Sequence, residues 1–172
     1  VSEAPVRRWQ LAADNTGTAQ SWRTRVSLGY RHANVMDRGH QLSANYQTSL
    51  EKPSRVSIIS MNYVVPLPAS ARRVDVYAVR SNVDGGSTPT AAGALQFNGR
   101  GNVLGIQATQ LLQRRGEWDQ RLRVGLDQRE YRNRCRIEGL PEGACGAAGE
   151  SVTVQPFSLD YSLHGGQAVQ LG

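Results

Sequence analysis

The chain has 172 residues, a formal net charge of +6 and an ordinary hydrophobic content of 39%. Its mean hydropathy is negative, and no stretch approaches the roughly 20 consecutive apolar residues that a membrane helix needs, which excludes a helical membrane protein. The charge comes almost entirely from arginine, since Lys52 is the only lysine. The arginines are scattered over nearly every segment without a basic helix or stacking aromatics, so no nucleic-acid partner is predicted.

Apolar and polar residues alternate with period two along the whole chain, and no segment has a convincing helical period. This pattern predicts an all-β, antiparallel fold. Eight segments are expected to be strands: 6–13, 22–31, 40–50, 55–65, 72–80, 94–112, 117–132 and 152–163. Several exceed the about 5–6 residues that are usual for strands of soluble proteins.

Residues 22–31 show the sharpest contrast between two strand faces. One face is apolar with an aromatic at each margin: Trp22, Thr24, Val26, Leu28 and Tyr30. The other carries guanidinium groups, a hydroxyl and a glycine: Arg23, Arg25, Ser27, Gly29 and Arg31. This contrast indicates lipid on one side and a water-filled lumen on the other, provided that the rest of the chain repeats it.

The following segments repeat the pattern with local breaks. The third segment places Leu42 and Tyr46 on its apolar face. Within 94–112 the apolar residues change parity, which predicts a bulge near Gly99 or Gly101.

The last two segments alternate as clearly as the second. Their apolar residues are Trp118, Leu122, Val124 and Leu126, followed by Phe157, Leu159 and Tyr161. The opposite face of segment 117–132 carries Asp119, Arg121, Arg123, Asp127 and Arg129. An arginine toward the bilayer centre costs roughly 2 to 4 kcal/mol, so these charges are predicted to line a hydrated lumen.

The connections divide into two sets at the two ends of the predicted strands. One end has the short connections 34–39, 66–71 and 113–116, and the other has 15–21, 51–54, 82–93 and 133–151. Short turns on one side and long loops on the other are typical of outer-membrane barrels, and the long loops face the exterior. Cys135 and Cys145 then fall in an extracellular loop, where an oxidising compartment favours one disulfide between them; a metal site lacks other ligands nearby.

Several short motifs follow one another in a recognisable order: DNTG at 14–17, RVSLGYRHANVMDRGHQLSANYQTSL at 25–50, MNYVVPLP at 61–68 and VQPFSLDYSLHGG at 154–166. In this order the chain resembles the start of the barrel of two-partner secretion transporters, the haemolysin-activator and haemagglutinin-exporter family. It departs from the family pattern at residues 38–40, where an acidic residue is expected after the glycine.

The resemblance implies an outer-membrane pore that exports, and can activate, a secreted partner such as a haemolysin or adhesin in unfolded form. It implies contact with outer-membrane lipid and lipopolysaccharide in a Gram-negative bacterium. Family members carry two periplasmic POTRA domains and a 16-stranded barrel. Residues 1–172 are therefore expected to form about half of one transmembrane β-barrel domain, without the POTRA domains or the C-terminal barrel half.

Two alternatives remain open at this point: another outer-membrane barrel channel, or a soluble β-sandwich binding module, for which alternation is equally natural. No nucleophile with a base and an orienting partner stands out in the sequence. We therefore predict no enzymatic activity, no cofactor and no metal.

Overall fold

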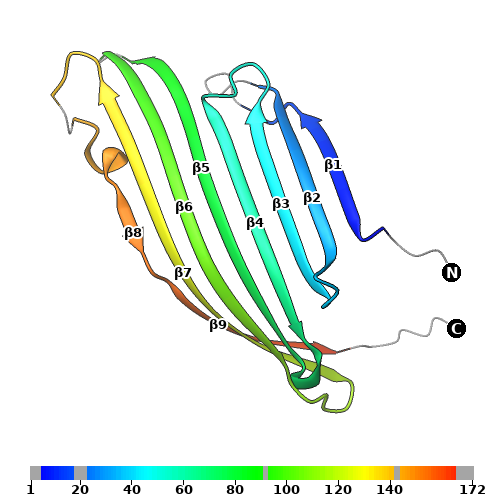
Figure 1. Ribbon diagram of the computed structural model, residues 1–172. Coiled ribbons are helices and arrows are strands. Elements are labelled where there is room, and N and C mark those ends of the chain that lie inside the picture. The colour runs from blue at the N-terminus through cyan, green and yellow to red at the C-terminus, as the bar shows by residue number, and fades with distance from the viewer. Residues whose placement is uncertain (1–4, 18–22, 91–92, 142–143, 166–172) are drawn as a thin grey trace, which may run out of the picture.

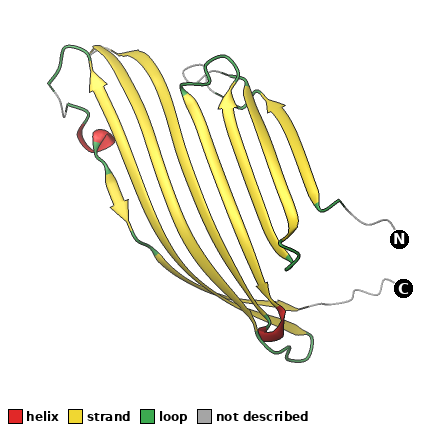
Figure 2. Cartoon of the chain, viewed as in Figure 1, coloured by secondary structure: helices red, strands yellow, loops and turns green. Residues whose placement is uncertain are grey.

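The computed structural model describes residues 5–17, 23–90, 93–141 and 144–165, which form one antiparallel sheet (Figure 1). Its strands are β1 (Arg7–Asp14), β2 (Arg25–Val35), β3 (His40–Ser49), β4 (Val56–Leu67), β5 (Arg72–Thr90), β6 (Gly93–Leu111), β7 (Trp118–Ile137), β8 (Val152–Val154) and β9 (Phe157–Gly165). Two short 3-10 helices, η1 (Pro68–Ser70) and η2 (Gly146–Gly149), lie in connections (Figure 2). No helix in these ranges is long and apolar enough to cross a membrane.

Each strand from β1 to β7 pairs with the next strand in the chain, and β8 and β9 both pair with β7. The sheet is therefore a meander in one layer, with β1 at one lateral edge and β8 and β9 at the other. Between the described strands no pairing joins these two edges. The prediction of an all-β antiparallel fold is confirmed, and the β-sandwich alternative fails because the described strands form a single sheet.

The predicted loop at residues 82–93 is wrong. β5 continues to Thr90 and β6 begins at Gly93, so residues 82–90 and 93 belong to two long paired strands. Their glycine, serine and threonine content is typical of a loop, but regular pairing of β6 with β7 extends as far as Leu95 and Ile137. A strand paired on its far side supplies the backbone hydrogen bonds that weak local propensity does not, so pairing overrides composition.

The predicted bulge near Gly99 or Gly101 lies instead in the neighbouring strand. The register of β5 with β6 shifts between Asp84 and Ser87, whereas β6 pairs with β7 without a break. Since β6 is paired on both sides, the extra residue is accommodated in β5, where it distorts one ladder only.

The eighth predicted segment is divided into β8 and β9 at Gln155 and Pro156. Both strands keep one register with β7, since Val154 pairs with Arg129 and Phe157 with Leu126. Proline has no backbone N–H to donate to the ladder, which explains the interruption. The Pro156 carbonyl still accepts a hydrogen bond from the Asp127 amide at 3.1 Å.

The two faces of the sheet differ in both chemistry and burial. We call the face that carries Leu28 and Leu126 the apolar face, and the face that carries Arg31 and Asp127 the polar face. The most buried side chains all lie on the polar face: Ser49, Val56, Val64, Asp75 and Thr109. Burial is thus greatest on the hydrophilic side, which is the reverse of a soluble sheet that packs its apolar face inward.

The turn between β3 and β4 is fixed by one carboxylate outside the strands. Glu51 accepts hydrogen bonds from the Thr24 amide at 3.1 Å and from the Ser49 hydroxyl at 2.8 Å, and so ties this turn to the start of β2. The bonds from Thr24 and then Ser49 lower the pKa of Glu51 from about 4.5 to about 2. The charged carboxylate therefore stabilises the folded turn.

We expect Glu51→Gln to lower stability at neutral pH, with a difference from the parent that disappears on acidification. Because the folded-state pKa lies below the unfolded one, the contribution of Glu51 is complete above pH about 4.5 and is lost as the pH falls toward about 2. Urea midpoints of both proteins across this interval measure the effect. A difference that stays constant with pH would show that the carboxylate charge plays no part.

Candidate functional site

The apolar face presents large hydrophobic side chains that nothing in the described sheet covers. Leu104 is 58% exposed, Leu126 56% and Leu159 65%. The Trp9 ring of the edge strand β1 lies against the Tyr30 ring of β2, with centroids 4.6 Å apart and the ring planes tilted by 46°. A contiguous exposed apolar surface of this kind marks contact with lipid or with another protein.

The structure places the predicted lipid-facing residues together on this face, as the strand register requires. They are Val26, Leu28 and Tyr30 on β2, Leu42 and Tyr46 on β3, Trp118, Leu122, Val124 and Leu126 on β7, and Phe157, Leu159 and Tyr161 on β9. The cross-strand pairs connect them through Ile59, Met61 and Tyr63 of β4 and Val76 of β5. Trp22 lies outside the described residues.

The apolar residues form a band that crosses the strands obliquely. Leu28 is the middle of the apolar run Val26–Tyr30 on β2. The residues that lie opposite it on the successive strands β3 to β7 are Tyr46, Ile59, Arg80, Asn102 and Glu130. On β7, Gln120 separates Trp118 from the unbroken apolar run Leu122–Leu126. The middle of this run is Val124, which lies 130 − 124 = 6 residues from Glu130.

This offset gives the tilt of the strands relative to the band. Six residues span about 20 Å, and the five steps from β2 to β7 span about 24 Å, so the band lies at roughly 40° to the hydrogen-bonded rows. Those rows run perpendicular to antiparallel strands. The strands are therefore tilted by the same angle, within the about 35–45° that is typical of transmembrane barrels.

The polar face contains a network that spans three strands. The Tyr77 hydroxyl of β5 donates a hydrogen bond to the Asp127 carboxylate of β7, and Arg129 donates to the same carboxylate from Nη2 at 2.5 Å and from Nε at 3.2 Å. The intervening strand carries Gly105 between the two partners. A Cβ at Gly105 would stand only 2.6 Å from Cε2 of Tyr77 and 2.5 Å from Oδ1 of Asp127, so this position requires glycine.

Other predicted lumen residues take the same face without joining this network. Arg25 and Arg31 lie on β2 and Asp119, Arg121 and Arg123 on β7. Arg123 is paired in register with Asp160 of β9, but neither Arg121 nor Arg123 forms an ion pair with another described residue. The prediction that Arg23 lies within this strand is wrong, because β2 begins at Arg25.

Cys135 and Cys145 form a disulfide with a Cα–Cα distance of 5.9 Å. Cys135 lies within β7 rather than in the loop, because β7 continues to Ile137. Cys145 comes immediately before η2, so the bond ties the long connection after β7 back to the strand. The described side chains contain no group of three or more histidine, cysteine, aspartate or glutamate residues that could hold a metal ion.

Sequence reasoning missed Tyr77 and Gly105 as members of the charged site. Tyr77 alternates with Val76 and Ala78 in a segment read for its apolar face, and Gly105 is one of several glycines in the next strand. The alternation of the sequence already placed Tyr77 on the face opposite Val76 and Ala78. Only the register between β5 and β6 shows that Tyr77 lies beside Gly105.

A single antiparallel meander with an oblique apolar band on one face and charged networks on the other is part of the wall of a transmembrane β-barrel. The sequence matches the family model of haemolysin secretion/activation proteins ShlB/FhaC/HecB over residues 1–139. The chain belongs to this family.

The structure is similar to CdiB from Escherichia coli, with a TM-score of 0.78 and 15% sequence identity. The match covers 98% of this chain and 30% of that chain, so the sequence spans about a third of its structural relative. At this identity the likeness establishes the fold. No curated protein sequence matches the chain.

Proposed function

We propose that this chain forms one side of an outer-membrane pore that exports a secreted partner protein in unfolded form. Membership of a haemolysin secretion/activation family supports this role. In this proposal the chain is part of one barrel domain, and further strands close the edges at β1 and at β8 and β9. Hydrocarbon cannot hydrogen-bond an open edge, so closure is needed in the membrane.

The observation that carries the proposal is the separation of the two faces. The apolar band would contact lipid, and the polar face would line the lumen with charges of both signs. Arg121 and Arg123 have no ion-pair partner among the described residues and would therefore project into hydrated space. A wall of this kind offers an unfolded chain transient polar contacts.

The test is neutralisation of three polar-face arginines, R31Q/R121Q/R123Q, in the full-length transporter. Removing three positive charges from a narrow aqueous path should shift ion selectivity toward cations and reduce partner export by about twofold or more. Planar-bilayer reversal potentials and the amount of partner in the culture medium measure both effects.

The matched control removes three arginines from the other face, R80Q/R100Q/R132Q. It carries the same change in charge and is expected to leave selectivity unchanged. Unaltered selectivity and export in the polar-face triple would contradict the assignment of this face to the lumen.

A further inference from the structure

The apolar face also carries a group of charged and amide side chains, on β5, β6 and β7. Its members, which we call the outward basic patch, are Arg80, Asn82, Arg100, Asn102, Glu130 and Arg132. They occupy two adjacent rows of the sheet: Arg80 pairs with Asn102 and Asn102 with Glu130, while Asn82 pairs with Arg100 and Arg100 with Arg132. They lie on the side of the band toward the β5–β6 hairpin end and the disulfide-bonded connection.

The patch keeps an excess of positive charge after its internal contacts are made. Arg132 forms an ion pair with Glu130 at 2.6 Å, and Glu130 also accepts a hydrogen bond from Asn102 at 3.2 Å. Arg100 donates from Nε to the neutral Asn82 side chain at 3.1 Å. No carboxylate among the described residues pairs with Arg80 or Arg100, so two guanidinium charges remain without an acidic partner.

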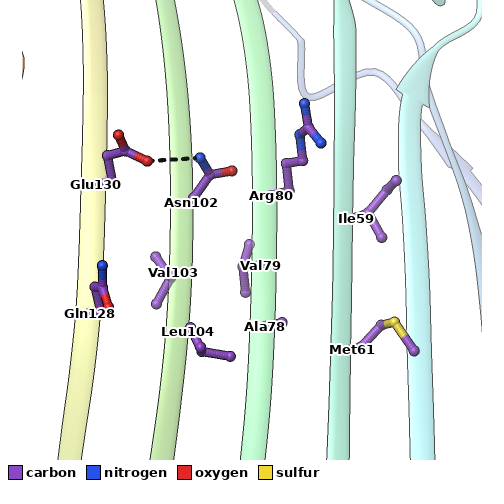
Figure 3. Close-up of a pocket in the computed structure, with 10 residues that line it drawn as sticks. All are labelled: Ile59, Met61, Ala78, Val79, Arg80, Asn102, Val103, Leu104, Gln128 and Glu130. Atoms are coloured by element: carbon purple, nitrogen blue, oxygen red, sulfur yellow. Dashed lines mark hydrogen bonds between the residues drawn. The ribbon is translucent and has the colours of Figure 1, made fainter.

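An apolar groove of about 340 Å³ opens directly against this patch (Figure 3). Its floor is low at Ala78, which lies between the longer side chains of Met61 and Leu104. Arg80, Asn102 and Glu130 line the end of the groove nearest the hairpin, where the dashed bond joins Asn102 to Glu130. The surface is therefore amphipathic, with room for a hydrocarbon chain below and cationic donors immediately above it.

We propose that the outward basic patch binds the phosphate groups of a phosphorylated glycolipid of the lipid A type, with an acyl chain in the groove beneath. This inference rests on the proposed outer-membrane location. Guanidinium groups bind phosphate with two parallel hydrogen bonds, and basic residues at the margin of a membrane band are attracted to anionic headgroups. The strands β5 to β7 continue for many residues beyond the band, so the patch lies at the level of headgroups rather than of acyl chains.

The experiment titrates the full-length protein in detergent with bisphosphorylated lipid A and counts bound lipid by native mass spectrometry. The triple variant R80Q/R100Q/R132Q should bind at least about tenfold more weakly than the parent. The charge-preserving R80K/R100K/R132K should bind more weakly than the parent but more tightly than the glutamine triple, because it keeps the charge and loses the two parallel hydrogen bonds. The polar-face triple R31Q/R121Q/R123Q should bind like the parent. Lipid A stripped of its phosphates should bind the parent poorly, and excess inorganic phosphate should not displace intact lipid A.

Equal affinity of the parent and the outward triple would overturn the proposal. So would an equal loss in both glutamine triples, full binding of dephosphorylated lipid A, or complete displacement by inorganic phosphate. The same variants separate this inference from the proposed pore. Ion selectivity and partner export depend on the polar-face arginines, whereas lipid A binding depends on the arginines of the outward basic patch.

Discussion

Alanine at Gly105 is expected to lower the free energy of unfolding of the barrel by about 3 kcal/mol, the sum of an overpacking cost and a weakened charge-assisted hydrogen bond. The added Cβ would stand within 2.6 Å of the Tyr77 ring and 2.5 Å of the Asp127 carboxylate. Backbone pairing fixes β6 on both sides, so the strand itself has little freedom to retreat. Tyr77 must move, and its hydrogen bond to Asp127 is weakened.

Guanidinium unfolding of the full-length protein in lipid vesicles measures this effect, and heat-modifiable gel mobility provides an independent check. In a Tyr77→Ala background the cost of Gly105→Ala should fall, because the clash with the Tyr77 ring is gone and only the close approach to the Asp127 carboxylate remains. Gly29→Ala is the matched control on the same face, since its nearest contact would be an ordinary 3.6 Å from Gln10 Cβ. Equal costs at Gly29 and Gly105 would contradict the packing of Tyr77 over Gly105.

A second large effect is expected for Leu28→Arg, at about 2 to 4 kcal/mol, because Leu28 is at the middle of the apolar band on β2. Asn102→Arg on β6 belongs to the same row of paired residues but lies beyond the band, so it should cost less than about 1 kcal/mol. Glu130 beside Asn102 offers the new guanidinium an acidic partner.

This pair of variants tests the oblique band directly. A band parallel to the hydrogen-bonded rows would place both residues at the same depth, and the two costs would then be equal. Unequal unfolding free energies in vesicles, with Leu28→Arg the more destabilising, are the expected result. Costs that agree within error would contradict a strand tilt of roughly 40°.

The sequence by itself determined which residues share a face. Alternation with period two is a local property, so Leu28 and Arg31 could be assigned to opposite sides without knowledge of any neighbouring strand. Turn residues located the short connections in the same way, and the ordered motifs indicated the family to which the chain belongs. Composition was misleading at residues 82–93, where pairing with neighbours extended both strands.

Only the tertiary structure decided which residues lie side by side across strands. Tyr77 and Asp127 are 50 residues apart, and their contact exists because two successive registers place both beside Gly105. The outward basic patch also depends on the register. Arg80 lies on the same face as Val76 and Ala78, and only the register shows that it lies beyond the apolar band, beside Asn102. Register depends on backbone pairing and packing between distant segments, whereas periodicity is set within a few residues of one strand.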